Sequence, residues 1–394
     1  MKRSKIKRLG NERGWFIWGG VFILVVVGFF SLFYIVAPSI LALNYKSEKL
    51  EAAVGESVAL KELPVVHLQT PEPLKAIYMS SWVAGTPSIR EGLVKLVEET
   101  ELNAIVIDIK DYTGKIAFEV LDPDLQKIGS AENRVPDMKD FIAELHKKNI
   151  YVIGRIAVFQ DPYMVKNRPD LAVKKKSDGA VWKDYKGITW LDAGSREVWD
   201  YAILIGRESY ALGFDELNFD YIRFPSDGNM KDISYPLSGV KPKPEVIRDF
   251  FEYLSANLRP SGVKISADLF GMTATNKDDL NIGQVLENAL PYFDYIAPMV
   301  YPSHYPPGFN GYNNPNKHSY EVVHFSMSEA AKRTLAASTT PLKLRPWLQD
   351  FDYGGDYDVP EVRAQIKATY DSGLTSWMLW SPSNKYTKGA LQSE

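Results

Sequence analysis

The sequence predicts an α/β fold over residues 73–394, a closed barrel of eight parallel strands known as the (β/α)8 or TIM barrel. Eight short apolar runs occur in this region, and amphipathic segments separate them, which is typical of parallel β-α-β units. The region of roughly 320 residues also lies within the size range of such barrels. A doubly wound open sheet is the alternative. That fold usually carries a glycine-rich phosphate turn after its first strand, which SSWVAGTPS matches poorly.

The expected elements follow one another regularly along the chain. The strands are, in order, KAIYMSSW from residue 75, NAIVIDIK from 103, YVIGRIAVF from 151, FDELNFDYI from 214, VKISADLF from 263, FDYIAPMVY from 293, KLRPWLQDF from 343 and TSWMLW from 375. We expect helices near residues 88–99, 136–148, 195–211, 244–259, 282–289, 319–337 and 360–372. Several of them begin at Ser, Asp or Pro, which are favoured at helix starts.

The N-terminal region predicts a membrane anchor. Residues 15–37 hold no charged side chain, and 23 helical residues are long enough to span a hydrocarbon core of roughly 30 Å. Residues 1–14 form a leader with six basic residues and one acidic residue, which we expect to stay in the cytoplasm. Residues 38–72 have no clear periodicity and are expected to form an extracellular stalk. The alternative is a cleaved signal sequence, which would make the protein secreted.

Charge and composition narrow the possible partners. The formal net charge is -3, and the leader contributes +5, so the remaining chain carries -8. An acidic body without a basic stripe argues against nucleic acid as a partner. The chain has no cysteine, its five histidines show no grouping, and no metal-binding or nucleotide-binding motif occurs. We therefore expect no metal and no cofactor.

The stretch FDELNFDYIRFPSDG, residues 214–228, is unusual because it places polar side chains within an apparently buried strand. Side chains alternate along a strand, so Glu216, Asn218 and Asp220 share one face, and their apolar neighbours share the other. We expect the polar face to point into the barrel and toward the C-terminal mouth, where barrel enzymes place their active sites. Such buried polar groups require a hydrogen-bonded network.

Other predicted strands also carry polar residues near their C-terminal ends, namely Asp108, Lys110, Arg155, Ser266, Asp268, Tyr301, Arg345, Gln349 and Trp380. Each has a simpler interpretation as a buried ion pair, a turn cap or a core residue. Two long segments, 160–194 and 302–318, add aromatic residues on the expected mouth side. Aromatic rings stack against sugar rings, so a carbohydrate ligand is expected. With carboxylates as the best acid and base candidates, glycoside hydrolysis is a natural chemistry.

Six blocks carry a family resemblance: GFDELNFDYIRFPSDG, VIDIKD, RIAVFQDP, SADLFG, APMVYPSHY and RPWLQDF. Over residues 73–394 the chain resembles the family of glycoside-hydrolase-like proteins first catalogued as a domain of unknown function. The resemblance implies a (β/α)8 barrel with a glycosidase-type site at the ends of the fourth and fifth strands. Carried over by position, Asp220 is the nucleophile and Asp268 the acid/base. Better studied barrels commonly have Glu at the second position, so Glu216 and Asp350 stay open as substitutes.

On this interpretation, Lys110 and Arg155 keep Asp220 ionised, and a less polar setting raises the pKa of Asp268. The expected substrate-binding residues are Asp108, Lys110, Arg155, Glu216, Asn218, Arg223, Tyr301, Gln349 and Trp380. The expected protein is a single-pass membrane-anchored glycoside hydrolase, whose extracellular domain cleaves a cell-surface or extracellular polysaccharide. Two alternatives remain, a catalytically silent barrel that binds glycan at the cell wall and a metal-dependent hydrolase such as a deacetylase.

Overall fold

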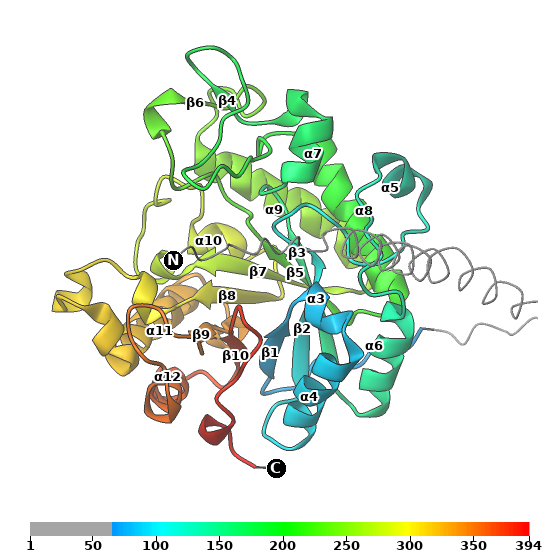
Figure 1. Cartoon of the computed structure of the whole chain (residues 1–394). Helices are drawn as coiled ribbons and strands as arrows, with labels where there is room; N and C mark the ends of the chain where they lie inside the picture. Colours follow the sequence, from blue (N-terminus) through cyan, green and yellow to red (C-terminus); the bar gives the residue numbers. More distant parts are fainter. Residues whose placement is uncertain (1–64, 394) are drawn as a thin grey trace, which may run out of the picture. The chain divides into compact units, whose positions relative to one another are not determined.

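The computed structural model describes residues 65–393, which form an eight-stranded parallel barrel (Figure 1). The closed order is β1-β10-β9-β8-β7-β5-β3-β2, which confirms the predicted TIM barrel. The strands are β1 (Lys75–Met79), β2 (Ala104–Lys110), β3 (Tyr151–Ala157), β5 (Glu216–Asp220), β7 (Lys264–Phe270), β8 (Tyr295–Met299), β9 (Trp347–Gln349) and β10 (Trp377–Trp380). The predicted leader, anchor and most of the stalk lie outside the described residues.

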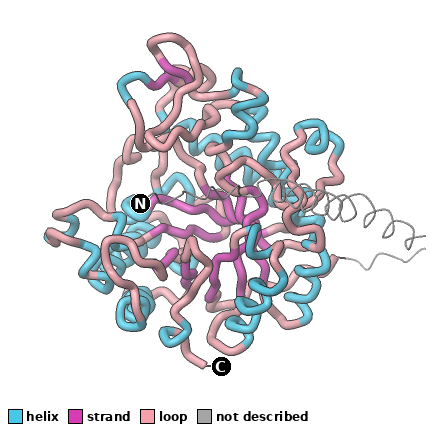
Figure 2. Tube along the Cα trace, in the orientation of Figure 1, coloured by secondary structure: helices cyan, strands magenta, loops and turns pink. Residues whose placement is uncertain are grey.

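Helices surround the strands, as Figure 2 shows. Those that match expectation are α4 (Pro87–Glu98), α6 (Met138–Lys147), α8 (Arg196–Leu212), α9 (Lys243–Leu258), α10 (Leu286–Ala289), α11 (Ser319–Ala336) and α12 (Val359–Asp371). Three further short helices were not predicted, α3 (Ser81–Ala84), α5 (Pro123–Ile128) and α7 (Pro162–Asn167). Strands β4 (Lys174–Lys175) and β6 (Ile233–Ser234) pair in a separate antiparallel sheet within the loops. Within residues 65–393, no helix is both long enough and apolar enough to cross a membrane.

The alternation of side chains on β2 shows how the strands separate two cores. Ile105, Ile107 and Ile109 pack in the cluster that includes the helices. Ala104 and Val106 belong to a second cluster with Tyr78, Trp347 and other residues of the barrel interior, and small residues there leave room for polar groups above them. Asp108 has the same parity as Ala104 and Val106, so its side chain also points into the barrel.

A β-bulge then interrupts β2. Asp108 pairs with Arg155 in the strand register, but the next pairing is Lys110 with Ile156, so the register shifts between Asp108 and Lys110. A bulge adds one unpaired residue and turns the following side chain to the other face. Lys110 therefore faces the helices, where its Nζ lies 2.7 Å from Asp161 Oδ2 and 5.4 Å from the ring centroid of Tyr201 on α8.

The N-terminal end of the barrel, its floor, is closed by the segment before β1. Leu68 packs against the inner cluster, and its backbone N–H donates to Asp215 Oδ1 at 2.7 Å. The same carboxylate accepts from the backbone N–H of Val152 at 2.8 Å and contacts His146 Nε2 at 2.9 Å. The ring of His67 stacks on Tyr210 of α8. Residues 65–72, which the sequence assigned to the stalk, thus contact the floor of the barrel.

Candidate active site

A pocket of about 380 Å³ opens at the C-terminal ends of the strands. Its lining from the strands and the turns just after them is Arg155, Asp220, Tyr221, Asp268, Phe270, Met299, Tyr301, Trp347 and Trp380. Loop residues complete it, namely Lys186, Arg223, Asp227, Gly271, Met272, His304 and Tyr305. A pocket with mixed apolar and charged walls at this face of a TIM barrel is the expected place for catalysis.

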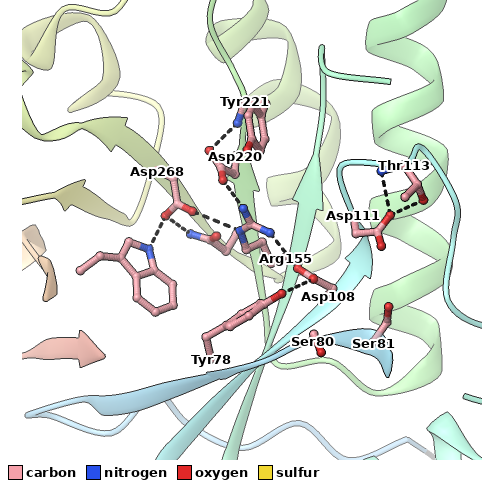
Figure 3. Close-up of polar contacts among 12 residues, drawn as sticks. Tyr78, Ser80, Ser81, Asp108, Asp111, Thr113, Arg155, Asp220, Tyr221 and Asp268 are labelled. Carbon is pink, nitrogen blue, oxygen red and sulfur yellow. Dashed lines mark hydrogen bonds and ion pairs between the residues drawn. The ribbon is translucent and has the colours of Figure 1, made fainter. Parts of the chain in front are cut away.

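Arg155 is surrounded by three aspartates, as Figure 3 shows. Its Nη2 pairs with Asp220 Oδ2, its Nη1 lies 2.8 Å from Asp108 Oδ1, and its Nε lies 3.6 Å from Asp268 Oδ2. Burial alone would lower the pKa of Arg155, but the carboxylates of Asp220 and Asp108 outweigh it and raise that pKa well above its ordinary value. One positive charge thus faces three carboxyl groups, and all four side chains are buried.

The carboxyl group of Asp268 has a raised pKa. Burial raises the pKa of Asp268 to about 8, and the negative charge of Asp220 adds to this shift. Asp268 Oδ1 accepts two hydrogen bonds, from Trp347 Nε1 at 2.8 Å and from Asn218 Nδ2 at 2.9 Å. Both donors reach Oδ1, whereas Oδ2 lies 3.6 Å from Arg155 Nε. The raised pKa favours the protonated form of Asp268 at neutral pH.

Asp220 stands at the end of β5, where the backbone turns sharply. Tyr221 follows it with φ of 53°, a left-handed conformation that an aromatic residue rarely adopts. The turn aims the Tyr221 N–H at Asp220 Oδ1, 2.5 Å away. Such strain persists where the surrounding structure fixes it, and it gathers at functional sites. Asp220 is thus held between a backbone donor on one oxygen and Arg155 on the other.

The structure brings many of the predicted site residues together. Six of them line the pocket: Asp220, Asp268, Arg155, Arg223, Tyr301 and Trp380. Asp108 and Asn218 lie one contact behind it, because Asp108 binds Arg155 and Asn218 binds Asp268. Burial raises the pKa of Asp108, which also accepts a hydrogen bond from the hydroxyl of Tyr78 at 2.6 Å.

Other predicted residues lie elsewhere. The bulge turns Lys110 to Asp161, so Arg155 alone of the two expected cations contacts Asp220. Glu216 lies nearer the floor, where its Oε2 contacts Arg345 Nη1 at 2.9 Å.

Two further residues, near the end of β9, are bound by neighbouring loops. Gln349 accepts from the hydroxyl of Ser303 at 2.8 Å. Asp350, offered as a substitute acid, accepts from the backbone and the hydroxyl of Thr387. Gln349 and Asp350 are both buried and do not line the pocket described above.

Sequence reasoning missed two residues of the inner network, Tyr78 and Trp347. Trp347 lies between Arg345 and Gln349 with the same parity, so the period of two along the strand identifies it. Tyr78 lies on β1, where it alternates with apolar neighbours and carries no charge that would attract notice.

The aromatic loops contribute to the site unevenly. Trp182 and Trp190 are buried, and their indole N–H groups donate to Asn229 O and Asp184 Oδ2, so they hold the loops together. His304 and Tyr305 line the pocket, and Tyr185 is 80% exposed beside Lys186. No group of three or more His, Cys, Asp or Glu side chains suited to a metal ion occurs within residues 65–393.

Comparison with solved structures finds several similar chains. The glycoside hydrolase domain of PgaB (BpsB) from Bordetella bronchiseptica is 13% identical with a TM-score of 0.56, covering 81% of this chain and 99% of that one. The glycoside hydrolase domain of PelA from Pseudomonas aeruginosa is 10% identical with a TM-score of 0.45, covering 82% and 98%. A hypothetical protein from Ruminiclostridium thermocellum is 38% identical with a TM-score of 0.45, covering 49% and 96%.

A comparison with curated protein sequences finds no match. A family comparison does find one, over residues 76–386, which include all eight barrel strands except the first residue of β1. The matched family is described as "Putative glycosyl hydrolase domain". The match covers well over half of the chain, and it agrees with the barrel and with a pocket that holds Asp220 and Asp268. The chain therefore belongs to this glycosyl hydrolase family.

Proposed function

We propose that this protein is a membrane-anchored extracellular glycoside hydrolase that cleaves a polysaccharide by a two-carboxylate mechanism. The observation that carries the proposal is the pairing of Asp220 and Asp268 in one pocket, beside the same arginine. One of the two is ion-paired, and the pKa of the other is raised to about 8. Two carboxyl groups whose environments differ in this way are what glycoside hydrolysis requires.

Asp220 is the nucleophile in this mechanism. Its carboxylate attacks the anomeric carbon, and the bond from that carbon to the leaving oxygen breaks as the Asp268 proton moves to that oxygen. The glycosyl ester on Asp220 is then hydrolysed by a water molecule, whose proton returns to Asp268. Trp347 and Asn218 fix the Asp268 carboxyl throughout. Two displacements at one carbon retain its configuration, so the product anomer reports on the role of Asp220.

The direct test digests purified cell-wall and exopolysaccharide fractions with the full-length protein and with Asp220→Asn, followed by mass analysis of the released oligosaccharides. We expect wild type to release fragments and Asp220→Asn to lose at least about 10⁴-fold in rate. Asp356→Asn makes the same chemical change on an exposed loop residue and should retain full activity. Undiminished turnover by Asp220→Asn would remove it from the mechanism. Binding without cleavage by wild type would favour a silent glycan-binding barrel.

The anchor is proposed from the uncharged run at residues 15–37 and the basic leader before it. Fractionation of cells that produce the full chain should place the protein in the membrane pellet. Detergent should then release it from that pellet. Protease added outside intact cells or spheroplasts should digest the barrel domain. A protein recovered from the medium with its first 37 residues removed would instead show a cleaved signal sequence.

A further inference from the structure

Arg223 lies at the pocket within a cage of aromatic rings. Its guanidinium carbon lies 4.9 Å from the ring centroid of Trp190, 5.1 Å from that of Phe270 and 5.6 Å from that of Tyr221. Its Nη1 donates to Phe224 O at 3.1 Å and to Ser226 Oγ at 3.2 Å. These contacts hold the planar group at the pocket wall and leave its Nε and Nη2 donors without a protein acceptor in the described part of the chain.

The charge of Arg223 is not balanced by a bound carboxylate. Within residues 65–393 it forms no ion pair, in contrast to Arg155 in the same pocket. Burial lowers the pKa of Arg223, because the guanidinium loses hydration there, and Asp220 and Asp227 act on it only at longer range. An arginine nevertheless stays charged in proteins. Arg223 is half-buried, and a partly desolvated charge of this kind is stabilised when an anion pairs with it.

Lys186 adds a second cation to the pocket lining. It lies on the exposed loop before α8, lines the pocket and forms no ion pair with another described residue. Among the carboxyl groups of the pocket, Asp220 is paired with Arg155, and the raised pKa of Asp268 favours its neutral form at pH 7. Asp227 and Asp184 also act on Arg223, but neither forms an ion pair with Arg223 or Lys186 among the described residues. Arg223 and Lys186 are therefore two cations of the pocket lining that have no ion-pair partner among the described residues.

We propose that Arg223 and Lys186 bind a carboxylate carried by the glycan, so that the substrate is an acidic polysaccharide. This inference rests on the proposed function and specifies its substrate class. The planar guanidinium suits a carboxylate because two parallel N–H donors match its two oxygens. The rings around Arg223 keep that fork oriented before the ligand arrives, which reduces the entropy lost on binding.

The test measures binding of two matched pairs of short oligosaccharides to the full-length protein in detergent. One pair is a hexasaccharide of alternating glucuronate and N-acetylglucosamine and the same hexasaccharide after carboxyl reduction. The other pair is N-acetylglucosaminyl-N-acetylmuramic acid and chitobiose, which differ by a lactyl carboxylate. The fluorescence of Trp347 and Trp380, which line the pocket, reports binding. Preference in the first pair identifies a uronate, and preference in the second identifies a lactyl ether.

Wild type should bind the carboxylated member of at least one pair about 10- to 100-fold more tightly, the usual gain from a charged hydrogen bond. Arg223→Gln should abolish this preference without weakening the uncharged member, and Lys186→Gln should reduce it. Lys186 is exposed, so its variant tests the proposal even if Arg223→Gln fails to fold. Lys183→Gln, on the same loop but outside the pocket lining, is the matched control and should change nothing.

Asp227→Asn should strengthen the preference, because it removes the opposing charge. Equal affinity for both members of both pairs would overturn the proposal, as would a preference that persists when Arg223 and Lys186 are both replaced by Gln. These readouts require binding alone, so they are independent of the Asp220→Asn hydrolysis test. An enzyme that cleaves a neutral glycan and shows no carboxylate preference would refute this inference and leave the proposed function intact.

Discussion

The barrel contains two buried clusters built from an arginine and carboxyl groups, one at the floor and one at the mouth. At the floor, Arg345 Nη1 contacts Glu216 Oε2 at 2.9 Å, and the hydroxyl of Tyr151 donates to the same oxygen at 3.2 Å. At the mouth, Arg155 meets Asp108, Asp220 and Asp268. The floor pairs one positive charge with one negative charge, whereas the mouth has more acids than bases and opens into a pocket. Matched charges support packing, and unmatched charges leave a proton available for chemistry.

The largest effect that tests this contrast is expected from Asp268→Asn. The variant cannot supply a proton to the leaving oxygen, so kcat should fall about 10²- to 10⁴-fold with little change in fold. Because the pKa of Asp268 is raised to about 8, the wild-type rate should fall as pH rises above that value. A pH–rate profile of both proteins checks this. If the rate of Asp268→Asn also falls at alkaline pH, that part of the wild-type profile reports the titration of another group.

Arg345→Met should show that the floor cluster is structural. Removing one partner of a buried ion pair leaves Glu216 uncompensated, so the free energy of unfolding should fall by about 3–5 kcal/mol. Adding Glu216→Leu should recover much of that loss, since an apolar pair leaves no buried charge. Denaturant unfolding measures the stability, and kcat of the folded double variant should remain near wild type. A large loss of kcat there would make the floor part of the catalytic machinery.

The proton on Asp268 also makes stability depend on pH. In the unfolded chain the carboxyl group loses its proton near pH 4, but the folded protein keeps it until about pH 8. Unfolding therefore releases a proton between these values, and stability should decline as pH rises across that window. The difference in slope between wild type and Asp268→Asn should be at most about 1.4 kcal/mol per pH unit. Denaturant titrations at pH 4.5 to 7, approximately, measure it; identical slopes would contradict the raised pKa.

The smallest effect concerns one hydroxyl in each cluster. Tyr78→Phe removes the donor to Asp108, and Tyr151→Phe removes the donor to Glu216. Each should cost about 1.5–3 kcal/mol of unfolding free energy, the usual range for a hydrogen bond to a charged group. Only Tyr78→Phe should also reduce kcat, because Asp108 positions Arg155. Equal losses of kcat in both variants would remove the distinction between the clusters.

Much of the site could be predicted from the sequence, because side-chain direction along a regular strand follows a period of two. Asp220, Asp268 and Trp380 were placed correctly at the pocket by that rule and by strand order. The rule fails where the strand is irregular. Lys110 is turned outward by a bulge, and a bulge depends on how two strands pair rather than on the residues of either strand.

The loops were harder to predict for a different reason. Their composition showed many aromatic residues, but composition does not distinguish a ring that faces a ligand from a ring that packs within its own loop. Trp182 is 1% exposed and Tyr185 is 80% exposed, although they lie three positions apart. The difference arises from long-range contacts, such as the one between the Trp182 indole and Asn229. Whether the charge of Arg223 is paired likewise depends on which residues long-range contacts bring next to it.

The closure of the floor by residues 67 and 68 has a mechanical consequence. Tension on the chain just before β1 is borne first by Leu68 on Asp215 and by the stacking of His67 on Tyr210. Asp215 passes this load to Val152 on β3 and to His146 on α6, and not to β1 alone. Pulling from the N-terminal side therefore strains the end of the barrel that lies opposite the pocket. Under such a pull, the spacing of Asp220 and Asp268 would be preserved.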